Sequence, residues 1–138
     1  MWQMKYLFSV VFVIIAFTLA FSAAAKPALR DNKVVTDGLV SVGIAIEIGE
    51  KCNSISARTL RGISYLNSLK GTARKQGYTD AEIDAFVDNK AEKKRLEQQA
   101  RAYLKSKGAS GGVGQAYCKV GAAEIAAGTA AGRLLRQR

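Results

Sequence analysis

The 138-residue chain has no histidine, two cysteines and one proline. Without imidazole, Ser–His and Cys–His catalytic arrangements are excluded, as are nearly all zinc-enzyme ligand sets. No glycine-rich phosphate loop follows a strand pattern, so nucleotide binding has no support. The length suits one domain, and beyond Pro27 no proline forbids a long helix.

The amino-terminal 25 residues have the pattern of a cleaved secretory signal peptide. Lys5 supplies a positive charge, an apolar run covers residues 6–21, and small residues at 22–25 suit signal peptidase. An uncleaved anchor is the alternative, but the run is shorter than the ~20 residues that span a bilayer. We expect residues 1–25 to be removed, leaving one domain over 26–138 that is periplasmic or secreted and has no transmembrane span.

The two cysteines, Cys52 and Cys118, both lie beyond the predicted cleavage site. Two thiols in an exported chain indicate one structural disulfide. A redox-active pair is the alternative, but the chain has no Cys-x-x-Cys motif. A metal site would need more ligands than two thiolates, so no metal or other cofactor is expected.

The segment 31–51 fits two kinds of secondary structure. Branched residues at alternate positions are typical of a strand: Val40, Val42, Ile44, Ile46 and Ile48. The spacing of Val35, Leu39, Val42 and Ile46 equally fits one face of a helix. The local pattern leaves both open, but no other segment alternates, and a lone strand would have no partner. We therefore predict a nearly buried central helix.

Further helices are predicted over 54–76, 79–88, 90–107 and 115–135, with a glycine-rich loop at 108–114. Thr79 and Glu82 form a capping box. On the second helix, Ile63, Leu66, Leu69 and Ala73 share one face. In the last helix, Gly128-x-x-x-Gly132 is typical of close helix packing, and a membrane dimer motif is the less favoured alternative. The fold class is therefore all-α: a small bundle of four to five helices with one disulfide.

Three stretches carry a resemblance to known proteins: residues 58–70, residues 77–88, and Cys118 followed by residues 123–135. In their order and spacing they resemble a bacterial family of small exported two-cysteine helical proteins of unknown function. The resemblance extends over about residues 30–136. It implies a helical exported domain and supports the pairing of Cys52 with Cys118, and it implies no activity.

Glu124 is the candidate buried acid, because helical spacing places it in a small apolar face between Gly121 and Gly128. A carboxylate in a poorly solvated place needs a compensating partner. We expect a structural ion pair, with Arg58 or Arg61, rather than a catalytic acid. No other residue is a candidate for catalysis, cofactor binding or metal binding.

The formal net charge is +10. A basic stripe is predicted along one side of the 90–107 helix: Lys90, Lys94, Arg101 and Lys105. It could face an anionic partner such as lipid headgroups, envelope polymers or acidic proteins, or it could simply be a solvated surface. Nucleic acid would bind non-specifically at most.

Three classes of function remain. The sequence favours a non-catalytic envelope protein that binds a partner through the basic face or through a groove between helices. A periplasmic chaperone-like protein of acid stress is the first alternative, resting on analogy with small two-cysteine helical chaperones. An enzyme of unrecognised type is the second. The identity of the partner and the oligomeric state stay open.

Overall fold

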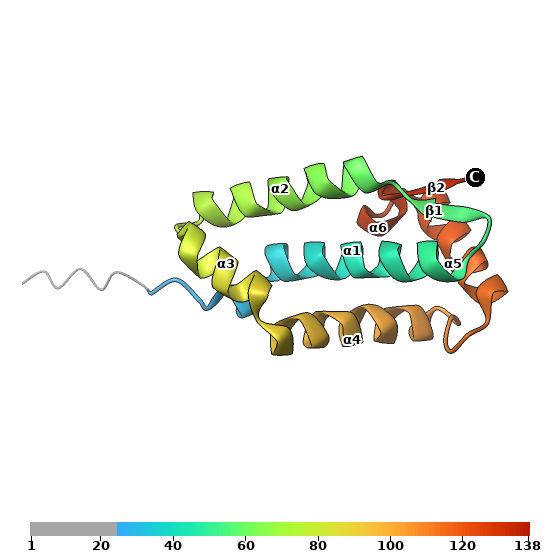
Figure 1. Ribbon diagram of the computed structural model, residues 1–138, viewed down its shortest axis with the longest axis horizontal. Helices are drawn as coiled ribbons and strands as arrows, with labels where there is room; N and C mark the ends of the chain where they lie inside the picture. Colours follow the sequence, from blue (N-terminus) through green and yellow to red (C-terminus); the bar gives the residue numbers. More distant parts are fainter. Residues whose placement is uncertain (1–24) are drawn as a thin grey trace, which may run out of the picture.

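The computed structural model describes residues 25–138, in which six α-helices hold most of the chain (Figure 1). Its elements in chain order are η1 (Leu29–Asp31), α1 (Lys33–Lys51), β1 (Ile55–Ala57), α2 (Thr59–Lys75), α3 (Asp80–Asp88), α4 (Lys90–Ser106), α5 (Gly114–Ala127), α6 (Ala130–Arg133) and β2 (Leu135–Gln137). The predicted all-α class is confirmed. The expected signal peptide lies, apart from Ala25, outside the described residues.

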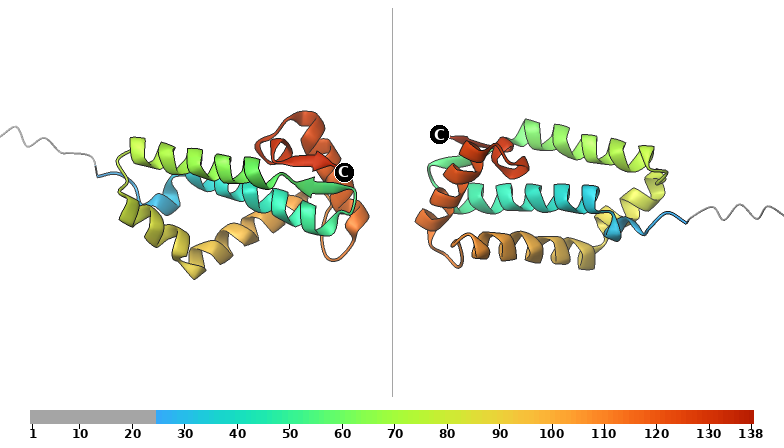
Figure 2. Two further views of the ribbon diagram at one scale, coloured as in Figure 1. Left: turned by 45° about the horizontal axis from the view of Figure 1, so that its top comes forward. Right: turned by 180° about the vertical axis from the view of Figure 1, so that it is seen from behind.

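Helix α1 is the centre of the fold, and α2 and α4 lie on either side of it (Figure 1). Helices α5 and α6 pack against the carboxyl-terminal half of α1 (Figure 2). Ile44, Ala45 and Ile48 of α1 are buried in the main core, where Ile48 is 0 % exposed. The helix predicted over 31–51 is confirmed as α1, but the expectation that it is nearly buried is wrong, because Ile46 is 47 % exposed.

The predicted single helix over 115–135 is wrong, because the chain reverses at Gly128. Helix α5 ends there at a φ of +61°, a left-handed conformation that favours glycine. Thr129 then caps α6, its side-chain oxygen accepting a hydrogen bond from the Gly132 N–H at 2.9 Å. Gly132 lies so close to α5 that an added Cβ would stand 1.9 Å from the Glu124 carbonyl oxygen. Short helix α6 is thus folded back tightly against the end of α5.

Two short strands and the disulfide join the end of α1 to the carboxyl-terminal region. Strands β1 and β2 pair antiparallel, with Ser56 opposite Arg136. The predicted disulfide is confirmed: Cys52 and Cys118 are bonded, with an S–S distance of 2.02 Å. Cys52 is 1 % exposed, so this bridge is part of the main core.

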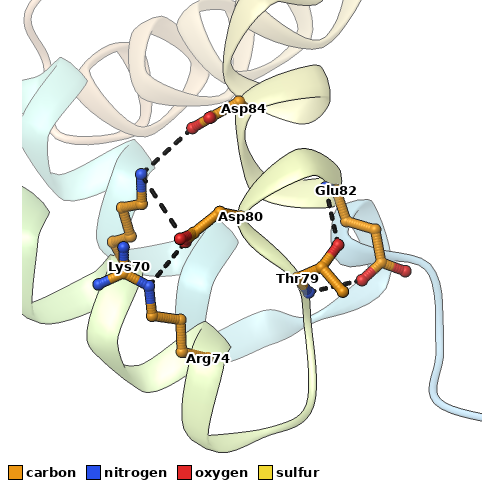
Figure 3. Close-up of polar contacts among 6 residues, drawn as sticks. All are labelled: Lys70, Arg74, Thr79, Asp80, Glu82 and Asp84. Carbon is orange, nitrogen blue, oxygen red and sulfur yellow. Dashed lines mark hydrogen bonds and ion pairs between the residues drawn. The ribbon is translucent and has the colours of Figure 1, made fainter.

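A second, smaller core lies where α3 meets η1 and the amino-terminal part of α1. Its buried residues are Leu29, Val35, Ala73, Tyr78 and Ile83. The capping box predicted at the start of α3 is present: Thr79 accepts from the Glu82 N–H, and the Glu82 carboxylate accepts from the Thr79 N–H (Figure 3). These bonds fix the direction in which α3 leaves the turn.

Charged side chains of α2 hold the start of α3 from the other side. The Arg74 Nε donates to Asp80 at 2.7 Å, and Lys70 lies 3.2 Å from Asp84 (Figure 3). The hydrogen bond from Arg74 lowers the pKa of the Asp80 carboxyl, and that from Lys26 lowers the pKa of Glu82. Asp80, Glu82 and Asp84 therefore serve as helix-start and ion-pair groups.

Replacing Thr79 by alanine should lower the free energy of unfolding by about 1 kcal/mol, because the Glu82 N–H loses its side-chain acceptor. Urea denaturation should show a lower midpoint with an unchanged slope. Thr79→Ser keeps a hydroxyl at the cap and should stay close to the original protein. Equal stability of the alanine and serine variants would show that the capping box adds nothing.

Candidate functional site

Within the described residues 25–138, the side of α1 that faces away from α5 is left uncovered. Helix α5 packs against Ile48, where Gly121 makes close contact. At 3.6 residues per turn, Ile46 lies about 160° around the helix from Ile48. Ile46 is accordingly 47 % exposed. Leu39 and Val42 share its side of α1 at helical spacing and are partly buried.

Two apolar hollows flank this side of α1 and share Val42 and Ile46. The first, about 360 Å³, lies between α1 and the α3–α4 segment, and its apolar lining includes Leu96. The second, about 220 Å³, lies between α1 and α2. Together the two hollows form what we call the α1 groove, whose apolar lining includes Leu39, Val42, Ile46, Ile63, Leu66, Phe86, Val87 and Leu96.

Side chains from three helices present exposed apolar surface to the α1 groove. Ile63 and Val87 are each 52 % exposed, and Leu66 is 38 % exposed. Ile63 and Leu66 lie on the predicted apolar face of α2 and line the hollow beside α1, but within α2 only Leu69 and Ala73 are buried. A contiguous apolar surface with a concave shape is typical of an interaction site.

The charged residues of the α1 groove are not those that the sequence suggested. Arg58 lines the hollow beside α2, and Lys93 and Glu97 line the hollow beside α4. Sequence reasoning missed Arg58 and Lys93 as site residues, because nothing in the local pattern shows which side of α1 stays open.

The predicted basic stripe of α4 lies outside the α1 groove. All four of its residues are exposed: Lys90, Lys94, Arg101 and Lys105. Arg101 is paired with Glu47 at 2.9 Å, and this hydrogen bond raises the pKa of Arg101. Arg101 and Lys105 line a different hollow, together with Lys51. The structure thus divides the predicted stripe between one ion-paired arginine and three lysines exposed to solvent.

Glu124 is buried, with 6 % of its surface exposed, but its partners are neutral. One carboxylate oxygen accepts from the Tyr103 hydroxyl at 2.5 Å, and the other accepts from the Thr129 hydroxyl. The expected ion pair with Arg58 or Arg61 is wrong: in residues 25–138 no Lys or Arg nitrogen lies within 4.0 Å of this carboxylate. Glu124 ties α5 to α4 and to the start of α6.

A family model described as "Family of unknown function (DUF5333)" matches residues 27–136. The chain belongs to the DUF5333 family. This match confirms the predicted resemblance to a family of unknown function. No curated protein and no solved structure matches the chain.

The part of this DUF5333 chain that matches the family holds both cysteines and the whole α1 groove. Within residues 25–138, no helix has the length and apolar character needed to cross a membrane. The same residues contain no group of three or more metal-ligating side chains.

The hydrogen bond to Glu124 raises the pKa of Tyr103 from 10.0 to about 12 in the DUF5333 chain. The folded protein therefore holds this proton more tightly than the unfolded chain does. The resulting stabilisation is complete below about pH 10 and is lost as the pH rises from about 10 to 12. Ultraviolet titration should show a late ionisation from the Tyr103 phenol.

Two variants identify that late phenol. Glu124→Gln should move the late transition back toward 10, and Tyr103→Phe should remove it. Tyr65→Phe should leave it in place, which makes it the matched control. A titration of the Glu124→Gln variant identical to that of the original protein would contradict the assignment.

Proposed function

We propose that this protein is an exported, non-catalytic binding protein that engages a partner protein through the α1 groove. The observation that carries the proposal is the uncovered side of α1, where two hollows share Val42 and Ile46. Burying exposed apolar surface contributes roughly 25 cal/mol per Å², so a partner that fills the α1 groove gains free energy from Ile46, Ile63 and Val87.

Two features support export. The first 25 residues have the charge, the apolar run and the small residues of a signal peptide. The bond between Cys52 and Cys118 suits an oxidising compartment such as the periplasm, where disulfides persist.

Two further features favour binding over catalysis. The chain has no histidine, and both carboxylate oxygens of its buried acid, Glu124, already accept hydrogen bonds from Tyr103 and Thr129. The chaperone alternative depends on acid to open the fold. The α1 groove is already open without such a change, which favours constitutive binding of a partner.

Site-specific crosslinking tests the proposal. A photoreactive residue at position 46 of the exported protein should give a discrete adduct in the envelope. The same residue at position 113 should give none, because Val113 is 62 % exposed but lies outside the α1 groove. Excess unlabelled protein should compete for the partner and lower the yield of the adduct, whereas an excess of the Ile46→Glu variant should leave the yield unchanged. Equal adducts at both positions would overturn the proposal.

Export has its own measurement. The protein recovered from the periplasm should have an intact mass that lacks residues 1–25, and it should contain no tryptophan, since Trp2 is the single tryptophan of the sequence. Recovery of the full-length chain in the membrane fraction would contradict cleavage.

A further inference from the structure

We infer that the partner in the α1 groove is an amphipathic α-helix with acidic residues flanking its apolar face. This inference rests on the proposed function, because it names the occupant of the same groove. Three observations carry it: the shape of the groove, the charges at its walls, and the distribution of ion pairs over the described residues.

The shape of the α1 groove suits a helix. The groove is bounded by α2 on one side and by α3 and α4 on the other, with α1 as its floor. Leu39 and Ile46 are seven residues apart, which is about 10 Å along α1. That distance corresponds to about two turns of an opposing helix, whose apolar side chains at i, i+3, i+4 and i+7 would enter the hollows. A flat lipid surface would leave a concave groove unfilled.

The walls of the α1 groove carry cations on both sides. Arg58 stands on the α2 side and Lys93 on the α4 side, and within residues 25–138 neither has a carboxylate within 4.0 Å. Glu97 is the carboxylate of the lining and shares the α4 wall with Lys93. A helix bound between these walls would place its two flanks next to Arg58 and Lys93, so acidic flanks would be complementary.

The described chain as a whole also has more cations without an ion pair than carboxylates without one. In residues 25–138, most Lys and Arg side chains lack an ion pair, whereas more than half of the Asp and Glu side chains have one. The surface therefore attracts an acidic partner from a distance. A second copy of this chain is disfavoured as the occupant, because two copies with this excess of cations repel each other.

Binding of synthetic peptides to the purified, disulfide-bonded protein tests the inference. The first peptide is an amphipathic helix with leucine at helical spacing and glutamate on both flanks. The second replaces every glutamate by lysine, and the third keeps the composition of the first but scrambles its apolar face. Fluorescence anisotropy should show that the first binds at least tenfold more tightly than the other two, with an affinity that falls as salt rises.

Charge-reversal variants locate the peptide. Arg58→Glu combined with Lys93→Glu should weaken binding of the acidic peptide at least tenfold. The affinity that remains should depend less on salt concentration. Lys90→Glu combined with Lys94→Glu makes the same change in net charge outside the groove, and should weaken binding less than threefold. All four positions are exposed, so both variants should fold, as circular dichroism would verify. Equal loss of peptide affinity in the two double variants would overturn the placement of the peptide in the α1 groove.

The outcomes separate this inference from the proposed function. Equal binding of the acidic and basic peptides would overturn the acidic occupant, while crosslinking at position 46 would still support the α1 groove. If position 46 crosslinks to a partner but the protein binds none of the amphipathic peptides, the inference of a helical occupant would be overturned and the proposed function would stand. Binding to anionic phospholipid vesicles instead, abolished by Ile46→Glu, would identify a lipid surface and overturn the inference. Sedimentation as a dimer that Ile46→Glu disrupts would identify a second copy and overturn it as well.

Discussion

Reduction of the Cys52–Cys118 disulfide should lower the melting temperature by roughly 15 °C. The bond closes a separation of 66 residues. Loop-closure entropy assigns about 4 kcal/mol to such a constraint, a large part of the 5–15 kcal/mol typical of a folded domain. For a domain of this size, each kcal/mol corresponds to about 4 °C. Thermal melting followed by circular dichroism, with and without reductant, measures the difference.

The control for this prediction is the double variant Cys52→Ala with Cys118→Ala. It should melt at a reduced temperature that reductant does not change. It should also be slightly less stable than the reduced original protein, because Cys52 is 1 % exposed and its sulfur packs in the main core. Two titratable thiols in the purified protein without reductant, or a melting temperature unaffected by reductant, would contradict a structural disulfide.

Gly132→Ala should destabilise the protein by about 3 kcal/mol, the upper range for an overpacked site. The added methyl group would meet the Glu124 carbonyl oxygen at 1.9 Å and the Ile125 backbone nitrogen at 2.8 Å. Both are backbone atoms of α5 and cannot move aside as a flexible side chain would. To relieve the contact, α6 must move away from α5, which also weakens the bond from Thr129 to Glu124. Urea denaturation measures the loss.

Gly71→Ala is the matched control for Gly132→Ala. Gly71 lies within α2, and an added Cβ there meets nothing within 4 Å. Alanine has the better helix propensity, so this variant should gain roughly 0.5–1 kcal/mol. If Gly132→Ala were as stable as the original protein, the close contact between α6 and α5 would not exist in solution.

The helices were largely predictable because their signals are local. The capping box at Thr79 and Glu82 fixes the start of α3 within the sequence itself. A helix over 31–51 was preferred because a strand there would have no partner, and α1 is a helix. The helix predicted over 54–76 begins only at Thr59, since Ile55–Ala57 form β1 and pair with β2. The pairing of Cys52 with Cys118 followed from the number of cysteines and the predicted export.

The α1 groove and the contacts of Glu124 were not predictable, because both depend on which elements meet in space. Periodicity shows that α2 has an apolar face, but it does not show that Ile63 and Leu66 lack a covering neighbour. Glu124 was expected to need a cation, whereas two hydroxyl groups from distant elements satisfy it. The break after α5 did have a local signal: Gly128 followed by Thr129 fits a helix stop and a new cap.

The pairing of β1 with β2 also has a consequence for the order in which the chain can fold. Ser56 and Arg136, which face each other in this pair, are 80 residues apart. A chain that emerges from its amino end exposes α1, β1 and Cys52 long before their partners in α5 and β2 arrive. Contacts of such long sequence separation form late. The domain therefore closes only when its last quarter has emerged, and until then Cys52 and β1 lack their partners in α5 and β2.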